Sequence, residues 1–536
     1  MSTCLFDSFP VELVHNIFHY LWAHEIFYGF ARLSSYIDNV LVGYDRYSIS
    51  LSSMLKHQFD LMCLHTRPEQ VISITLVENN DTPNQSEMFF SKFDILQFIN
   101  LRSFSIISSN QSIFRQLNLL CRLNNFQSLT LPHISDTYWC LFGSSVETTL
   151  PRLKQLITRD YPLMEPLNNM KYLTITHCYC HNLEYLLSQM TNLYSLNITL
   201  SLNMSTHWSR KVPMMNHLRQ LTLCIQYGRL TMEKMHKFLL KMPCLMHFEL
   251  RIDDPMDFVV GDQWKVWSQS SEIDIEEAKD IIDGNQWKYL VSHLQTFDFH
   301  FCLADRLNKQ ILDSFRSSFW LTQKRWFVAY DDLQSSSSLF TVPRFAPKNI
   351  IYLLNYDTPS CTSSDLCLDQ YVDILNLPTL RPLMHHFINV TSLILQTDKD
   401  LCLDRILPYL ALPQLKSFSL VNTSLLTQLS TETRFESIRS LTIDTLEIKF
   451  HAEQICIVFP RIERLKIGIS DQETMLLLID RLKHLSLVTF VYPQPSMFTN
   501  ITYEWFVENS SRFKENKNFT CNINKVEIHL WISVEE

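Results

Sequence analysis

The chain has 536 residues, of which 46% are hydrophobic and 19% are charged, a balance typical of globular rather than disordered proteins. This length exceeds what one compact core supports, so we expect several domains or one elongated array. The net charge of −9 without a basic domain argues against nucleic-acid binding, and the presence of only seven glycines argues against glycine-rich phosphate loops.

Residues 1–46 are predicted to form three short amphipathic helices. Pro10 suits the first turn of a helix, and Glu12 follows where the helix dipole favours an acid. Apolar residues then recur at spacings of three and four, which marks one helical face; they occupy positions 10, 13, 14, 17, 18 and 21. Two further helical runs follow near residues 26–33 and 37–41. Helices this short need a partner surface to bury their apolar faces.

The first of these helices resembles the opening of an F-box. The stretch reads Phe9-Pro10-x-Glu12-Leu13-x-x-x-Ile17-Phe18-x-x-Leu21, against a family pattern of Leu-Pro-x-Glu-Leu or -Ile followed by Ile-Phe-x-x-Leu. The resemblance covers residues 5–46 and implies contact with the Skp adaptor of cullin–RING ubiquitin ligases through Phe9, Pro10, Glu12, Leu13, Ile17, Phe18 and Leu21. Where family members commonly carry a basic-x-Trp, this chain departs from the pattern with residues 34–39. The alternative is a helical cap that shields the first repeat.

A hexad of the form L-x-x-L-x-L, such as Leu218-Arg219-Gln220-Leu221-Thr222-Leu223, recurs along most of the chain. Hexads of this type begin at Leu101, Phe126, Leu153, Met170, Leu193, Leu218, Leu245, Leu294, Val390, Leu415, Ile438, Ile462 and Leu487. Most steps between neighbours are 23–27 residues, the interval of a leucine-rich repeat, in which each unit adds a strand and a returning helix or turn. Stacked units of this kind form a solenoid with a parallel sheet on the concave side. The alternative is an ordinary α/β protein rich in leucine.

The predicted fold is therefore α/β, with a small all-helical F-box followed by a leucine-rich-repeat-like solenoid. We divide the chain into an F-box-like domain (1–46), a first repeat block (47–302), an irregular insertion (303–389), and a second block with a C-terminal cap (390–536). Beyond the hexads, strands are expected at 71–76, 326–330, 339–342, 350–354 and 526–532, and helices at 233–240 and 503–509. The acidic segment 253–286 is expected to be a solvated loop and helix face, or alternatively a docking patch for a basic partner.

One cluster, His177-Cys178-Tyr179-Cys180-His181, contains four residues of zinc-ligand type, but their spacing is too tight for a tetrahedral site. Counted from the Met170 hexad, Cys178 falls at the Asn/Cys position that follows the strand of a repeat, which favours a structural cysteine. None of the common catalytic or nucleotide-binding motifs is present. We expect no metal, no cofactor and no catalysis. An unrecognised active site would be sought in the insertion.

Residues between the hexad leucines are expected to face the concave side of the sheet. In the first block they are mostly polar and uncharged, with Arg219 and His247 among them. In the second block they include Lys416, Arg439, Arg464 and Lys466, against Glu463. This basic half predicts either a site for an acidic or phosphorylated ligand or a solvated strand face.

No apolar run approaches the ~20 residues of a membrane-spanning helix, and the first residues lack the features of a secretory signal. The 14 cysteines are therefore expected to be free thiols in a cytoplasmic or nuclear protein. The function predicted is a substrate-recruiting adaptor of a Skp–cullin–F-box ubiquitin ligase that holds an unknown protein substrate. The alternative is a non-catalytic repeat scaffold or inhibitor with a helical cap.

Overall fold

The computed structural model of the chain is an α/β fold with two sheets in which most neighbouring strands are parallel. It describes residues 5–52, 54–77, 82, 84–107, 119–120, 122–131, 152–159, 169–201, 212–226, 231–253, 282–303, 309–332, 337–351, 359–363, 368–377, 387–396, 414–421, 434–444, 452–492, 500–515, 518–524 and 526–533. Most of the acidic segment at 253–286 lies outside the described residues.

The helices of the described residues are short. The α-helices are α1 (Val11–Phe18), α2 (Ala23–Phe30), α3 (Ser35–Gly43), α4 (Lys56–His65), α5 (Gln85–Lys92), α8 (Cys180–Gln189), α9 (Met232–Leu239), α12 (Gly284–Val291), α13 (Ala452–Val458), α14 (Gln472–Arg481), α15 (Tyr503–Asn509) and α16 (Ser511–Glu515). The single-turn and irregular helices are η1 (Leu5–Ser8), η2 (Pro68–Gln70), η3 (Ile95–Gln97), η7 (Lys309–Phe315), η8 (Phe319–Lys324) and η9 (Leu368–Tyr371). The three N-terminal helices and the helices expected at 233–240 and 503–509 are confirmed as α1–α3, α9 and α15.

The first sheet has ten parallel strands in chain order and an antiparallel end. The parallel strands are β1 (Tyr47–Leu51), β2 (Val71–Leu76), β3 (Ser103–Ile106), β4 (Ser128–Leu131), β5 (Gln155–Thr158), β6 (Tyr172–Tyr179), β7 (Ser195–Ser201), β8 (Gln220–Gln226), β9 (His247–Asp253) and β10 (Thr296–Leu303). The sheet continues through β12 (Ser337–Val342), β11 (Phe327–Asp332) and β14 (Ser360–Cys361). The strands expected at 326–330 and 339–342 are thus confirmed as β11 and β12, and both stay in the first sheet because β12 pairs with β10 and β11.

The second sheet repeats this plan of parallel strands followed by an antiparallel hairpin. Its order is β13 (Asn349–Ile351), β15 (Ile374–Leu377), β16 (Ser392–Leu395), β17 (Ser417–Leu420), β18 (Ser440–Ile443), β19 (Arg464–Gly468), β20 (Leu487–Val491), β22 (Glu527–Ile532) and β21 (Phe519–Ile523). The sheet begins before the expected boundary at residue 390, because β13 and β15 come from the segment expected to be irregular. Of the strand expected at 350–354, residues 352–354 lie outside the described part of the chain.

The hexads set the register of both sheets. We number the hexad positions 1–6, so that 1, 4 and 6 are the apolar ones. Position 4 of each hexad pairs with position 4 of the next, as in Leu221 with Phe248 and Phe248 with Phe297. The apolar side chains of these strands alternate toward the core, which gives burial patterns such as that of β8. Each unit therefore buries its leucines only by stacking on its neighbours.

The structure changes the predicted set of hexads in two places. The last one begins at Leu485 rather than Leu487, because Val488 and Phe490 pair with Leu465 and Ile467 of β19. An additional hexad begins at Val372, since Leu375 of β15 pairs with Leu393 of β16.

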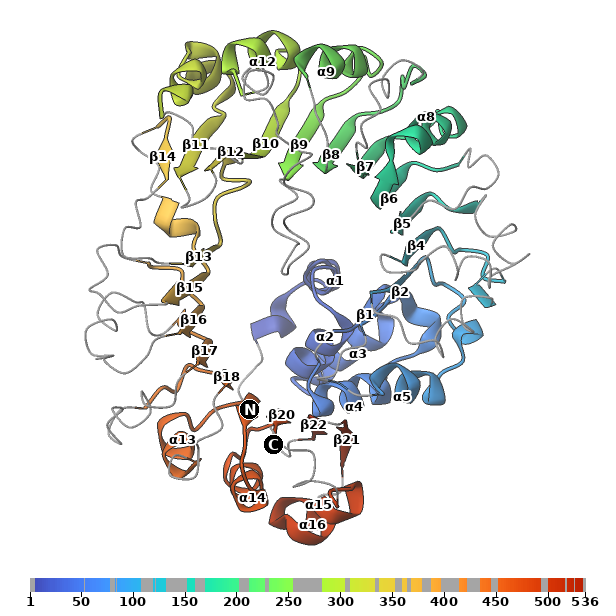
Figure 1. The fold of residues 1–536 in the computed structure, drawn as a ribbon. Helices are drawn as coiled ribbons and strands as arrows, with labels where there is room; N and C mark the ends of the chain where they lie inside the picture. The colour runs from blue at the N-terminus through green and yellow to red at the C-terminus, as the bar shows by residue number, and fades with distance from the viewer. Residues whose placement is uncertain are drawn as a thin grey trace.

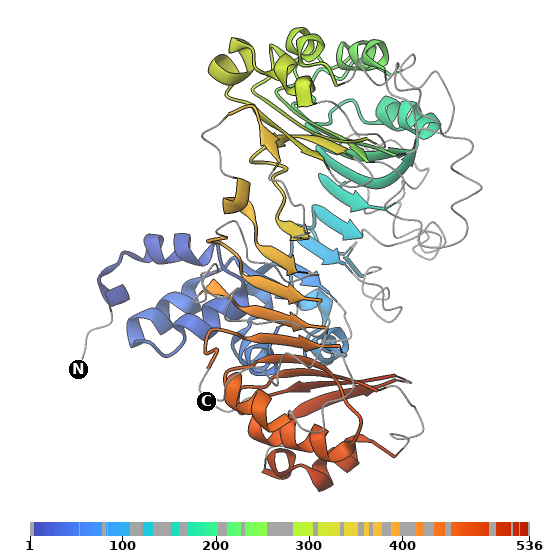
Figure 2. The ribbon, with the colours of Figure 1, turned by 60° about the vertical axis from the view of Figure 1, so that its left-hand side comes forward.

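The two sheets follow one ring-shaped path with strands on the inner side and helices such as α9, α12 and α14 on the outer side (Figure 1). The helices α1–α3 stand out to one side of the strands (Figure 2). One apolar cluster extends from Val14 through the first sheet and also includes Leu487 and Trp531 of the second sheet.

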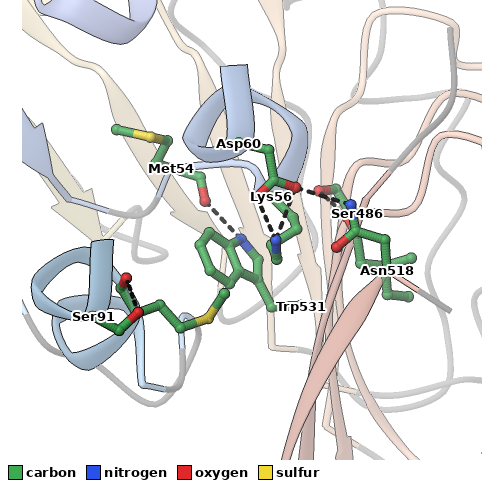
Figure 3. A network of polar contacts seen from close by, with 9 residues as sticks. Met54, Lys56, Asp60, Ser91, Ser486, Asn518 and Trp531 are labelled. Carbon is green, nitrogen blue, oxygen red and sulfur yellow. Dashed lines mark hydrogen bonds and ion pairs between the residues drawn. The ribbon is translucent and has the colours of Figure 1, made fainter. Parts of the chain in front are cut away.

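The ring closes where the C-terminal hairpin meets α4 (Figure 3). The Trp531 indole Nε1 donates to the main-chain oxygen of Met54 at 2.8 Å, and its ring packs on Phe59 with centroids 5.2 Å apart. Lys56 lies 5.4 Å from the Trp531 ring centroid and pairs with Asp60 at 2.6 Å, while Asn518 donates to Asp60 at 3.0 Å. These contacts join segments that are separated by most of the chain.

Candidate functional site

Two surfaces of the described residues expose side chains that could bind a partner. They are the apolar outer face of α1 and a basic cavity at one edge of the first sheet. On α1, Val14 and Phe18 form the inner face and are 0% and 1% exposed. Phe18 packs edge-on against Phe30 and Tyr44, with ring centroids 5.1 and 5.5 Å apart. The helix is thereby fixed to the rest of the N-terminal helices by one of its two apolar stripes.

The second apolar stripe of α1 faces away from the protein. Residues three and four apart share one side of a helix, and Pro10, Leu13, Ile17 and Tyr20 have this spacing. Leu13 is 51% exposed and Tyr20 is 87% exposed, and Ile17 is half-buried. Other apolar side chains within residues 5–46 that reach the surface include Val11, Trp22 and Leu33. We call the apolar set Pro10, Leu13, Ile17 and Tyr20 the α1 outer stripe.

The other residues implied by the F-box resemblance lie at the two ends of α1. Phe9 and Leu21 are half-buried, whereas Pro10 and Glu12 are exposed. Phe18 lies in the core, so its side chain is not offered to a partner. In the segment that departs from the family pattern, Ser34 caps α3 by accepting a hydrogen bond from the Ile37 amide, and the Tyr36 hydroxyl donates to the Phe9 main-chain oxygen at 2.5 Å. These residues tie α3 to the start of α1.

The basic cavity lies where strands β5 to β8 begin and has a volume of about 820 Å³. Its lining comes from position 2 of four successive hexads and from the residue just before each hexad: Arg152, Lys154, Asn169, Lys171, Asn192, Tyr194, His217 and Arg219. We call it the strand-edge cavity. The described residues of its lining include four Lys or Arg side chains and no carboxylate. Among the described residues, no acidic side chain forms an ion pair with Arg152, Lys154 or Lys171.

A main-chain ladder aligns these side chains. The amide of each position 2 residue donates to the carbonyl of the previous one: Lys171 to Lys154 at 2.9 Å, Tyr194 to Lys171 at 2.8 Å, and Arg219 to Tyr194 at 2.8 Å. The ladder runs along the first sheet through Arg102, Gln127, Lys154, Lys171, Tyr194, Arg219, Met246 and Gln295. No residue in this series is acidic.

The corresponding ladder of the second sheet has mixed charge. It runs through Lys348, Asp373, Thr391, Lys416, Arg439, Glu463 and Ser486. Arg439 pairs with Glu463 at 3.3 Å, and Lys466 of β19 pairs with Glu527 at 3.7 Å. Lys416 and Arg464 are exposed. The second-sheet cations predicted as a ligand face are therefore partly neutralised by neighbouring carboxylates.

Of the charged residues predicted for this face, only Arg219 lines the strand-edge cavity. His247 lies on the next strand, where its Nδ1 is 2.9 Å from the Thr296 hydroxyl. Sequence reasoning missed Arg152, Lys154, Lys171 and His217. Lys154 and Lys171 occupy the same hexad position as Arg219, so the hexad alignment contained the signal that identifies them.

A second polar group on the sheet is structural. Glu249 is 9% exposed and accepts hydrogen bonds from Arg251 at 2.7 Å and from Arg344 at 2.9 Å. On the adjacent strand, the Thr341 hydroxyl donates to Asp298 at 3.1 Å. Burial raises the pKa of Asp298, although the Thr341 hydrogen bond opposes the shift. These contacts connect β9 and β10 to β12 and the turn that follows it.

The His177–His181 cluster is divided between two elements. His177, Cys178 and Tyr179 belong to β6, whereas α8 begins at Cys180. Cys178 is 3% exposed, as a structural cysteine after the hexad would be. Among the described residues, no group of three or more His, Cys, Asp or Glu side chains is arranged to hold a metal ion.

Compared with known proteins, the chain matches no protein-family model and no curated protein. Within the described part of the chain, no helix combines the length and the apolar character needed to cross a lipid bilayer.

Proposed function

We propose that this chain is an intracellular substrate-recruiting adaptor of a Skp–cullin–F-box ubiquitin ligase. Residues 5–46 act as the F-box and dock on the Skp adaptor. The two sheets form a leucine-rich-repeat solenoid that holds a protein substrate. The chain supplies no catalytic group; it accelerates ubiquitin transfer by holding the substrate near a charged enzyme supplied by its partners.

The observation that carries the proposal is the α1 outer stripe. A helical cap buries its apolar residues against the first strand, whereas a docking helix keeps some of them on the surface. Leu13, at the centre of the stripe, is half exposed, while Val14 and Phe18 on the opposite side anchor the helix. Exposed apolar clusters of this kind are typical of protein interfaces.

The repeated hexads support the second half of the proposal. Their strands follow chain order in both sheets, and each pairs in register with the next. Stacked units offer an extended surface for a protein ligand.

The alternative, a binding scaffold with a helical cap, is favoured by the packing of α2 on α4 and by the apolar core that α1–α3 share with the first sheet. In that case the α1 outer stripe would bind no adaptor.

A pull-down on immobilised Skp adaptor tests the proposal. We expect the full-length chain to be retained and Leu13→Arg to lose retention by roughly tenfold or more, because a charge enters the centre of the apolar contact. Leu240→Arg is the matched control, since Leu240 is 60% exposed at the end of α9, far from α1 in the ring. Circular dichroism confirms that both variants are folded.

Failure of the wild-type chain to bind would reject the adaptor function and leave the capped scaffold. Equal loss in Leu13→Arg and Leu240→Arg would show that retention depends on general surface apolarity rather than on α1.

A further inference from the structure

The strand-edge cavity has a charge opposite to that of the whole chain. The protein carries a net charge of −9, yet Arg152, Lys154, Lys171 and Arg219 meet in one cavity, and no described residue of its lining is a carboxylate. Arg152, Lys154 and Lys171 are exposed, and Arg219 is half-buried beside Met246. Among the described residues, none of the four cations pairs with an acidic side chain. An unneutralised row of cations attracts anionic groups and forms charge-assisted hydrogen bonds with them.

The dimensions of the cavity fit a short peptide. It spans four adjacent strands, and a strand spacing of ~4.8 Å makes the row of position 2 residues roughly 14 Å long. That is the length of about four residues of extended chain. The volume of about 820 Å³ falls within the range of sites that enclose a ligand of this size.

The uncharged lining favours a peptide over a small polyphosphate. Tyr194 lies in the cavity and its ring is 5.8 Å from that of Tyr172, and both rings are more than 40% exposed. Asn169 and Asn192 add amide groups next to the cations. A peptide has apolar side chains and main-chain groups that use the tyrosine rings and the amides, whereas a polyphosphate has no apolar surface to place on the rings.

We propose that the strand-edge cavity binds a phosphorylated, acidic segment of a protein. Lys154 and Lys171 at the centre contact the phosphate groups, and Arg152 and Arg219 bind acidic groups at the two ends. The idea that this phosphorylated segment belongs to a ligase substrate rests on the proposed function. The binding of such a segment by the cavity does not depend on the Skp adaptor. A nucleic-acid ligand is disfavoured, because the chain carries a net charge of −9 and has no basic domain.

Fluorescence anisotropy with the purified full-length chain tests the site without any adaptor present. The probe is a labelled peptide with two phosphoserines three residues apart, flanked by glutamates; the same peptide without phosphate, tripolyphosphate and oligouridylate are the comparison ligands. We expect the phosphopeptide to bind most tightly and to weaken as salt is raised. Lys154→Glu/Lys171→Glu should weaken binding by about tenfold for each reversed charge.

The matched control is Lys348→Glu/Lys416→Glu, which reverses two charges at the equivalent ladder positions of the second sheet. It should leave binding within about twofold, because those residues lie outside the cavity. Lys154→Gln/Lys171→Gln provides a milder variant, and thermal unfolding confirms that all variants fold.

Equal binding by the wild type and by Lys154→Glu/Lys171→Glu would overturn the assignment of the cavity. Tighter binding of tripolyphosphate or oligouridylate than of the phosphopeptide would overturn the peptide assignment. Phosphopeptide binding by a chain that does not bind the Skp adaptor would retain the site and reject only the ligase role.

Discussion

At the scale of single residues, hydrogen-bond partners decide which polar groups the structure tolerates near its core. Asp298 shows this on β10, where it lies close to the Glu249–Arg344 pair and accepts a hydrogen bond from Thr341. Burial raises the pKa of Asp298, and the Glu249 charge adds to the shift. The carboxyl therefore holds its proton more strongly in the folded chain than in the unfolded chain.

The sign of this shift predicts a pH dependence. The stabilisation from protonated Asp298 is complete below the unfolded pKa near 3.8 and is lost as the pH rises through the folded pKa. Asp298→Asn, which still accepts from Thr341 but never ionises, should raise Tm at pH 7 and change it little at pH 4. Differential scanning fluorimetry at both pH values measures this, with the exposed Asp444→Asn as the control. A lower Tm at pH 7 would show that the Asp298 charge stabilises the fold through Arg344.

At the scale of elements, helix ends illustrate how the outer layer is fixed to the strands. Asp471 precedes α14, and its carboxylate accepts hydrogen bonds from the Thr474 amide at 2.7 Å and the Thr474 hydroxyl at 3.0 Å. The helix places Met475, Leu478 and Ile479 in the core of the second sheet. A capped first turn thus holds the packing face of α14 in place.

Asp471→Ala should lower the free energy of unfolding by about 1 kcal/mol, because the Thr474 amide loses its partner. Urea denaturation gives the value, and hydrogen exchange should accelerate in the first turn of α14. Asp471→Asn retains an acceptor and should recover most of the loss. If alanine and asparagine were equally destabilising, the cap would not be the cause.

The sequence predicted the positions of the strands better than it predicted the side chains that surround them at the sheet edge. The hexad period located most strands because the apolar side chains at positions 1, 4 and 6 enter the core unit after unit. It missed β1, whose position 1 is Arg46, and it misplaced the last hexad because Leu485 and Leu487 are both buried. The strand-edge cavity could not be predicted from the hexad period alone. Its prediction also requires the main-chain ladder, because the sequence does not show which position 2 cations lie beside a carboxylate.

At the scale of the whole molecule, the contact of the C-terminal hairpin with α4 joins the two ends of the ring. Trp531 contributes to the apolar cluster of the first sheet, although β22 belongs to the second. It is fully buried and satisfies the main-chain oxygen of Met54. Helix α4, on which α2 packs, therefore depends on the last strand for part of its support.

Trp531→Phe should destabilise the chain by about 1–3 kcal/mol. The Met54 oxygen loses its hydrogen-bond donor, and the smaller ring packs less well on Phe59. Hydrogen exchange should increase first in α4. Trp505→Phe on α15 is the control, since this indole is only partly buried and packs against the apolar cluster of the second sheet. Unchanged exchange in α4 would contradict a role of Trp531 in closure.

The ring closure also has a consequence for synthesis on the ribosome. The hydrogen bond between Trp531 and Met54 spans 477 positions, so α4 is made long before the strand that covers it. At ~5–20 residues per second, this interval lasts roughly 25–95 s. Throughout that time Phe59 lacks its contact with the Trp531 ring. A chain that stops before residue 531 never forms this contact. Premature termination even within the last strand should therefore expose the beginning of the protein to chaperones and proteases.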